Sequence, residues 1–388
     1  YILINFVVGI YISKKRVSLQ EKGGFISHYF IGNRSMGGIV LAMTLVATFT
    51  SASSFIGGPG IAYTKGLVWV YLSMIQVPTA FIILAILGKK FGMISRKIGA
   101  VTVTDYLKER YQSKTVAILA SICLVIFFIA QMMSQFIGGA VLFQEITGLS
   151  YIYGLALFGI VVILYTAFGG FRAVVITDTI QGIIMVLGGF IMIFTIIHVA
   201  GGTDMLLAKL NTANPHWSDI AGDGATPKAF VMSTVSSLLL LASAGIVKDI
   251  YHNYVMDATV KDTSSGEKKI SKLSIFTTLV VGIIVFVFTV YPPDLIVWIN
   301  LFAMGGLECA FFCPIIFGLY WKKANATGAV ISMLCGVVGF LLLNQFKVSM
   351  FGTTAIVPGI LISVLTFVVG SLVGKKTSDD TLKLFFDK

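Results

Sequence analysis

The sequence predicts an all-α protein that crosses a membrane many times, and three observations carry this prediction. Hydrophobic residues make up 57% of the chain and charged residues only 12%, with a mean hydropathy of +0.94. The hydrophobic residues occur in stretches close to the roughly 20 residues that a transmembrane helix needs. The cations gather between these stretches on one predicted side. A soluble domain could not cover so much apolar surface, so that class is excluded.

The chain opens with an apolar stretch over 1–12, which is short for a span and predicts the last part of a leading helix. It carries neither the basic segment nor the cleavage site of a signal peptide. A polar, basic loop over 13–35 follows.

The next stretch, 37–60, predicts a helix that is broken inside the membrane. It reads GGIVLAMTLVATFTSASSFIGGPG, so hydroxyl residues crowd its second half and Gly and Pro follow. Ser and Thr compete for backbone hydrogen bonds, and Gly and Pro are poor helix formers. Freed carbonyl oxygens at this depth must face protein or a polar cavity, as in secondary transporters. A packing helix softened by small residues is the alternative.

The remaining apolar stretches predict the other spans. They lie roughly at 66–88, 115–143, 151–168, 173–199, 231–247, 273–291, 294–320, 327–345 and 355–374. Residues 91–114 are basic and amphipathic, which predicts a helix lying at the membrane surface. The segments 200–229 and 248–272 are predicted polar loops, and the charged tail after residue 374 is expected to be mobile.

The cations predict the orientation of the chain. If the loops alternate between the two sides, 24 of the 28 Lys and Arg residues fall on one side, leaving only Lys65, Lys209, Lys228 and Lys347 opposite. The positive-inside rule places the cation-rich side, with the C-terminus, in the cytoplasm. The net charge of +11 is therefore a topology signal, and no nucleic-acid partner is expected.

The sequence offers little support for an enzyme. It contains no GxxxxGK[ST] loop, no HExxH and no GxSxG motif, and its four His are scattered. Its four Cys lie in apolar stretches without a metal-binding spacing, which predicts buried thiols rather than a metal site or disulfides. They are Cys123, Cys309, Cys313 and Cys335.

Two acids and a hydroxyl pair lie inside predicted spans. Charges there are costly and usually functional. For Asp178 a transport role competes with helix capping or pairing with Arg172, and for Glu308 with a structural ion pair. The adjacent hydroxyls of Ser233 and Thr234 suit a hard monovalent cation when joined by freed carbonyls. Packing is the alternative for this pair.

Four motifs resemble the sodium:solute symporter family over nearly the whole chain. They are YFIGNRSMGGIVLAMTLVATFTSASSFIGGPG, LYTAFGGFRAVVITDTIQG, VMSTVSSLLLLASAGIVKDIY and FGLYWKKANATGA. The resemblance implies a LeuT-type helix bundle, in which five core helices are repeated with inverted topology. One helix precedes the core and two follow it, so about 13 helices are expected in the intact protein.

The resemblance also implies site residues. Sodium would be held by the carbonyls of Ala47 and Thr50 and the hydroxyls of Ser233 and Thr234, and Asp178 would lie on the inner sodium path. Side chains expected to line the substrate cavity are Ser54, Ser73 and Gln76. Sodium is the coupling ion, and no cofactor or other metal is expected.

The chain departs from the family pattern at one point. The first repeat, 37–199, shows five core spans, but the second, 231–320, shows three before the trailing pair at 327–374. Phe230 also stands where the family motif has an alanine that supplies a sodium ligand. We therefore expect that roughly 100 residues, two core helices, are missing between 230 and 231. The loss of two helices leaves every later loop on the same side of the membrane, so the charge pattern cannot reveal it.

The expected function is sodium-coupled import of a small solute across the cytoplasmic membrane of a bacterium. Pantothenate is the favoured solute, and a sugar, proline or a monocarboxylate is the alternative. A transporter-like membrane sensor is a more distant possibility. The chain is expected to form one transmembrane domain over 1–388.

Overall fold

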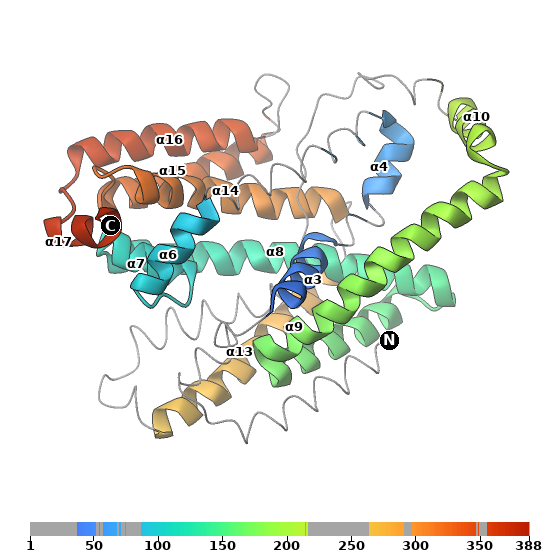
Figure 1. Cartoon of the computed structure of the whole chain (residues 1–388), viewed down its shortest axis with the longest axis horizontal. Coiled ribbons are helices and arrows are strands. Elements are labelled where there is room, and N and C mark those ends of the chain that lie inside the picture. The colour runs from blue at the N-terminus through green and yellow to red at the C-terminus, as the bar shows by residue number, and fades with distance from the viewer. Residues whose placement is uncertain are drawn as a thin grey trace. The chain divides into compact units, whose positions relative to one another are not determined.

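A computed structural model describes residues 37–51, 54, 57–67, 70, 74, 87–213, 215, 264–290, 296–346, 348 and 355–387. Within these ranges the regular elements are helices, as predicted (Figure 1). They are α3 (Gly38–Phe49), α4 (Gly58–Lys65), α6 (Lys89–Lys97), α7 (Val103–Tyr111), α8 (Lys114–Thr147), α9 (Tyr151–Ala200), α10 (Thr203–Ala213), α13 (Ser264–Thr289), α14 (Ile296–Tyr320), α15 (Ala326–Gln345), α16 (Ile356–Val373) and α17 (Asp379–Phe386). The predicted leading helix over 1–12, the span over 231–247 and the junction at 230/231 lie outside the described residues.

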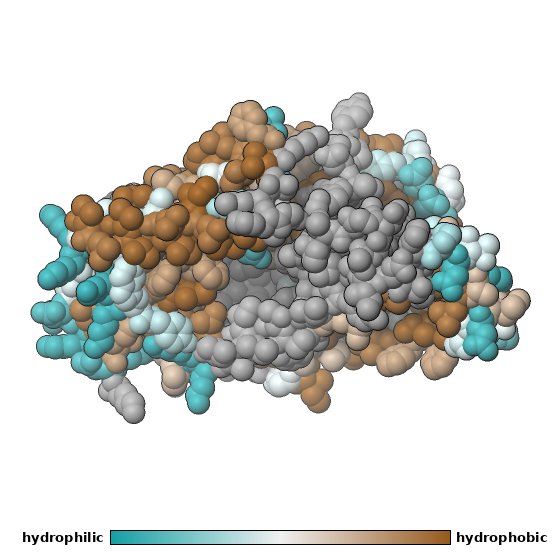
Figure 2. Space-filling model, turned by 90° about the horizontal axis from the view of Figure 1, so that it is seen from above, coloured by the Kyte–Doolittle hydropathy of each residue, from teal (hydrophilic) through white to brown (hydrophobic). Residues whose placement is uncertain are grey.

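Six segments of the described helices are long and apolar enough to cross a membrane. They are Lys114–Thr147, Val174–Ala200, Lys272–Thr289, Ile299–Tyr320, Ala326–Gln345 and Ile356–Val373. Each matches a predicted span. Figure 2 shows hydrophobic residues on the outer surface of α16, where Leu361, Leu365 and Val369 are exposed, as a lipid-facing helix requires.

The predicted break in the first core helix is confirmed. Helix α3 ends at Phe49, and Thr50 adopts an extended backbone with φ −87° and ψ 118°. The poor helix formers Gly58, Pro59 and Gly60 nevertheless lie inside a helix, because α4 begins at Gly58 and contains all three. Proline suits the first turn of a helix, where its missing N–H would have no partner anyway.

The predicted boundary between the spans 151–168 and 173–199 is absent. Both apolar stretches exist, as Tyr151–Leu164 and Val174–Ala200, but the 50-residue helix α9 runs through both. Gly169 and Gly170 lower helix propensity by about 1 kcal/mol each, yet they keep the backbone N–H that proline lacks and so do not end the helix.

The single surface helix predicted over 91–114 is instead two helices, α6 and α7. Gly99, at φ +66°, ends the first, and Thr102 caps the second. The Thr102 hydroxyl accepts a hydrogen bond from the Asp105 N–H, while the Asp105 carboxylate accepts one from the Thr102 N–H. This reciprocal capping box fixes the start of α7.

The tail predicted to be mobile contains α17. Ser378 caps this helix, and Thr381 and Phe385 are buried. Phe385 packs against the ring of Tyr106 at 5.8 Å between centroids. The apolar Phe385–Phe386 pair stabilises the helix by packing. The prediction of a mobile tail considered only the charged residues and overlooked this pair.

The described chain divides into two compact units, whose described parts are taken separately. The first includes α3, α4, α10, α9, the second half of α8 from Gln131, residues 278–289 of α13 and the start of α14 as far as Asn300. The second includes α6, α7, the first half of α8, the start of α13, α14 from Leu301, and α15 to α17.

In the second unit, cations hold the end of α14. The fully buried Arg110 donates hydrogen bonds to the carbonyl oxygens of Gly318 at 2.7 Å and Trp321 at 3.1 Å, and Lys90 donates to that of Leu319. Carbonyls at a helix C-terminus lack intrahelical donors and attract cations. Arg110 is therefore a buried structural cation and not part of an exposed polar face.

In the first unit, close backbone contacts join α3 to α9 and α8 to α9. A Cβ atom built on Gly182 would lie 2.7 Å from the Met43 carbonyl oxygen, and one on Gly154 would lie 2.8 Å from that of Ala140. Glycine is needed at both positions, because any side chain would separate the helices. The middle of α3 is thereby held against α9.

Candidate functional site

The chain leaves α3 through a hydrogen-bonded turn. The Thr50 N–H donates the last helical bond to the Val46 carbonyl at 2.9 Å. The Ser51 N–H then donates to Ser54 Oγ at 2.8 Å, and the Ser54 N–H donates to the Ser51 carbonyl at 2.9 Å. These bonds fix a defined path for the broken segment.

The two predicted carbonyl ligands lie at this helix end. Ala47 is fully buried in the last turn of α3. Thr50 lies beyond the helix and has an extended backbone. Main-chain oxygens of this kind can bind a hard cation such as sodium.

Ser51 is a polar residue of the break that was not singled out as a site residue from sequence. Its side chain is only 5% exposed, and its hydroxyl has no hydrogen-bond partner among the described residues. A buried hydroxyl without a partner costs free energy unless a ligand or water completes it. The crowded TSASS run was the available signal, but its four hydroxyl residues could not be ranked.

Asp178 lies in the interior of α9 and is fully buried. The helix-capping alternative is therefore wrong, because α9 begins at Tyr151. Asp178 lies one turn before Gly182, the residue that contacts Met43 of α3, so both occupy one face of α9. A carboxylate thus lies near the packed contact between α3 and α9.

The other predicted residues are only partly described. Ser54 is half-buried and accepts the turn hydrogen bond, and Glu308 is half-buried in α14. Ser73, Gln76, Ser233 and Thr234 lie outside the described residues. The structure therefore packs the middle of α3 against the face of α9 that carries Asp178, and the serine turn follows directly after α3.

A second polar group lies midway along α8 in the first unit. Gln131, Ser134, Gln135 and Asn300 are all at least 95% buried. Gln131 Nε2 donates to Asn300 Oδ1 at 3.3 Å, and Ser134 Oγ donates to the Gln131 carbonyl at 2.8 Å. These residues were also missed from sequence, although QMMSQ is a polar interruption of an apolar 34-residue helix.

The sequence profile of the sodium:solute symporter family matches residues 29–230 and 225–336. The chain belongs to the sodium:solute symporter family. The chain is 35% identical to the sodium/pantothenate symporter of Escherichia coli strain K12, over 98% of this chain and 97% of the relative. A sodium/pantothenate symporter of Haemophilus influenzae is 34% identical over 98% and 96%.

A solved structure shows the fold of this symporter. A Na+-coupled sialic acid symporter in a substrate-bound, outward-open state superposes with a TM-score of 0.74, at 17% identity, over 97% of each chain. The symporter therefore has the predicted all-α, LeuT-type fold. Family membership makes it a multi-pass membrane transporter that couples transport to sodium.

Proposed function

We propose that this symporter imports pantothenate together with sodium across the cytoplasmic membrane of a bacterium. The observation that carries the proposal is the 35% identity to a sodium/pantothenate symporter along nearly the full length of both chains. The H. influenzae symporter supports the same solute. Both relatives are bacterial, which supports the location, and the cation count supports a cytoplasmic C-terminus.

Sodium binds, on this proposal, where α3 ends. The carbonyls of Ala47 and Thr50 and the hydroxyls of Ser233 and Thr234 are its ligands. The burial of Ala47 and the extended backbone of Thr50 support the first two. Four neutral oxygens suit an ion that must leave in each cycle.

Asp178 serves the inner sodium path. It lies near the Val174 end of its apolar stretch, a short distance from Arg172, which the charge pattern assigns to the cytoplasmic side. A buried carboxylate at that depth can receive the cation as it leaves the central site. Its position on the face of α9 that contacts α3 supports this role.

Pantothenate is an anion with two hydroxyl groups and one amide, and Ser54, Ser73 and Gln76 are the proposed neutral lining. The Ser54 hydroxyl accepts the Ser51 N–H in the turn that follows α3, and it is a neutral polar group. The N-terminus of α4, which begins at Gly58, offers a partial positive charge to the carboxylate.

Coupling follows from shared use of the broken helix. Sodium bound at the end of α3 would favour one arrangement of the serine turn, and that arrangement binds solute better. By linkage, solute then raises sodium affinity by the same factor. Alternating access moves both ligands past a fixed midplane site.

We also propose that the functional protein has about 90 to 100 further residues, two core helices, at the 230/231 junction. The alignment to the E. coli relative spans 476 positions, 88 more than the 388 residues of this chain. The family profile matches in two pieces that meet at residues 225–230. The first observation supports the number of further residues, and the second supports their location near residues 225–230.

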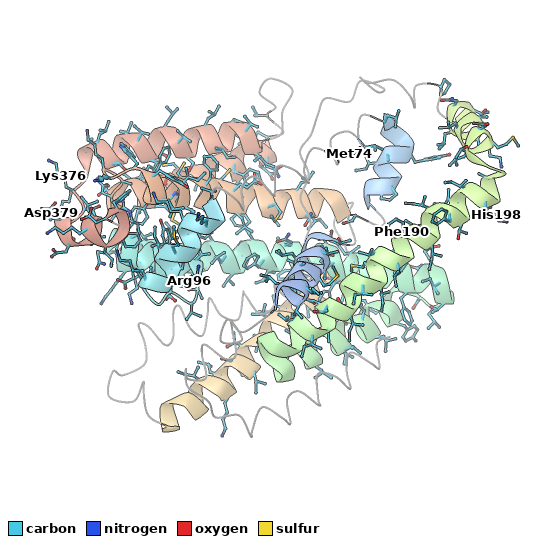
Figure 3. The ribbon with its side chains drawn as sticks, viewed as in Figure 1. Met74, Arg96, Phe190, His198, Lys376 and Asp379 are labelled. Atoms are coloured by element: carbon cyan, nitrogen blue, oxygen red, sulfur yellow. The ribbon has the colours of Figure 1, made fainter. Side chains whose placement is uncertain are left out.

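The surface of α9 supports this second proposal. Within the described part of the chain, no residue between 183 and 199 is buried, although Phe190 and Phe194 are 59% and 69% exposed and the segment is apolar all round. Figure 3 labels Phe190 and His198 on this segment. A helix that is apolar all round is covered by protein or by lipid, and we propose that the two further helices cover part of this surface.

The test is uptake of labelled pantothenate by the full-length protein reconstituted into proteoliposomes. We expect accumulation with an inward sodium gradient and little without it. Excess unlabelled pantothenate should compete, whereas proline, glucose and lactate should not. Uptake that does not depend on the sodium gradient would overturn the assignment. Stronger inhibition by one of the other solutes than by unlabelled pantothenate would also overturn it.

A further inference from the structure

The polar group on α8 contains an acceptor that the fold does not use. Gln131 is 1% exposed and lies midway between the ends of α8. Its Nε2 donates to Asn300 Oδ1, but its Oε1 has no hydrogen-bond partner within the described residues. Water is scarce at that depth, so an amide oxygen without a donor is costly.

The neighbours of Gln131 do not need that oxygen. Ser134 donates its hydroxyl proton to the Gln131 main-chain carbonyl, and its hydroxyl oxygen lies 3.3 Å from Gln135 Nε2, which donates to it. The bond to Asn300 restrains the Gln131 side chain. A restrained amide with one free acceptor is built to receive a hydrogen-bond donor.

We propose that Gln131 Oε1 accepts a hydrogen bond from the transported solute and so helps to select it. This inference rests on the proposed function, since it takes pantothenate as the solute. Pantothenate offers three donors, namely two hydroxyl groups and one amide N–H. Gln131 belongs to the same compact unit as the serine turn after α3. A solute held at that turn would form hydrogen bonds with the uncharged Gln131 amide as well as with hydroxyl groups. Gln131 carries no negative charge, so it would not repel the carboxylate of the solute.

The alternative role for such a cluster is packing alone. A packing pair between helices normally satisfies both partners, and transmembrane polar contacts of that kind contribute modestly. Gln131 instead satisfies its donor and leaves its acceptor open. This open Gln131 Oε1 acceptor favours a role in solute binding over a role in packing alone.

The test combines one variant with three solute analogues. Gln131→Met keeps the length of the side chain and removes both polar atoms. We expect it to raise the KM for pantothenate about tenfold, the effect of one hydrogen bond, with a smaller change in maximal rate. The analogues are the two deoxy-pantothenates, each lacking one hydroxyl, and the N-methyl amide.

One analogue lacks the donor that binds Gln131 Oε1, and the native protein should transport it poorly. Gln131→Met should transport this analogue no worse than the native protein does, because the hydrogen bond is already lost when either partner is absent. The control is Ser121→Ala, which removes a buried hydroxyl of the same helix that is satisfied by the Ala117 carbonyl. It should leave every KM unchanged.

Three outcomes would overturn the inference. Gln131→Met could lower thermal stability with no change in any KM, as a packing role requires. It could raise the sodium concentration for half-maximal uptake instead, which would make the amide a sodium ligand. It could weaken all three analogues as much as pantothenate. Absence of sodium-dependent pantothenate uptake by the native protein would instead refute the proposed function.

Discussion

The hydroxyl of Tyr111 donates a 2.7 Å hydrogen bond to the carbonyl oxygen of Pro314. This bond joins α7 to the interior of α14, two helices that are far apart in the sequence. Tyr106, on the same helix, is equally buried, but its hydroxyl has no hydrogen-bond partner among the described residues. The two tyrosines therefore differ in one respect that mutation can isolate.

Replacing each tyrosine by phenylalanine should change stability in different directions. Tyr111→Phe removes a buried hydrogen bond between α7 and α14 and should lower the free energy of unfolding by about 1 kcal/mol. Tyr106→Phe removes an unsatisfied hydroxyl and should be neutral or slightly stabilising. Thermal unfolding of the purified variants in one detergent gives the comparison. The reverse order would show that the hydrogen bond is not formed in the membrane protein.

Alkaline pH should destabilise the second unit. Burial raises the pKa of Tyr106 and Tyr111, against the opposing effect of Arg110. Their stabilising contribution is complete below the unfolded pKa of about 10 and declines as pH rises above it, because the unfolded chain ionises first. The melting temperature should fall between about pH 10 and 12. The double phenylalanine variant should show a shallower fall, and equal slopes would contradict the assignment.

Ser51→Ala tests the turn after α3. The hydroxyl has no protein partner within the described ranges, so its loss should leave the melting temperature within about 1 °C. We expect it nevertheless to raise the KM for solute or the half-saturating sodium concentration about three- to tenfold, as loss of one ligand hydrogen bond would. The matched control is Thr212→Ala, an exposed hydroxyl on α10 that donates to the Ala208 carbonyl. Unchanged transport by Ser51→Ala would make the hydroxyl irrelevant.

Sodium dependence tests the proposed hydroxyl ligands directly. Ser233→Ala and Thr234→Ala should each raise the sodium concentration for half-maximal uptake about ten- to hundred-fold, the scale of about 1–3 kcal/mol for a lost contact with a charged group. The maximal rate at saturating sodium should change much less. Thr234→Ser keeps the hydroxyl and should be mild. Wild-type sodium dependence in both alanine variants would place the ion elsewhere.

Intact mass tests the junction at residues 230 and 231. The chain as given has a mass of 41.9 kDa. The protein purified from its native host should be about 10 kDa heavier, as roughly 90 further residues of average mass require, and peptide mapping should place the extra residues between Phe230 and Val231. A tryptic peptide that reads directly from 230 to 231 would refute the proposal.

Span positions were predictable because apolar length is a strong signal. The bounds of α8, α14, α15 and α16 agree with the sequence within a few residues, and the break after α3 followed from its hydroxyl residues. The helix α17 was not predictable, since the packing of Phe385 against Tyr106 stabilises it. The continuous α9 was not predictable either, since a glycine pair can end a helix or lie within one. Ser51 and Gln131 were missed for another reason: whether a buried polar atom finds a partner depends on contacts that one sequence does not reveal.

The docking of α17 has a consequence for biosynthesis. Arg110 gains the rings of Phe385 and Phe386 as neighbours, at 5.8 and 5.4 Å. The ribosome must complete α8 to α16 before these rings exist, so a nascent chain carries Arg110 and Tyr106 without this cover while most of its helices are already in the membrane. Synthesis that stalls before α17 would leave those groups open to membrane proteases, so the docking of α17 completes the cover of Arg110.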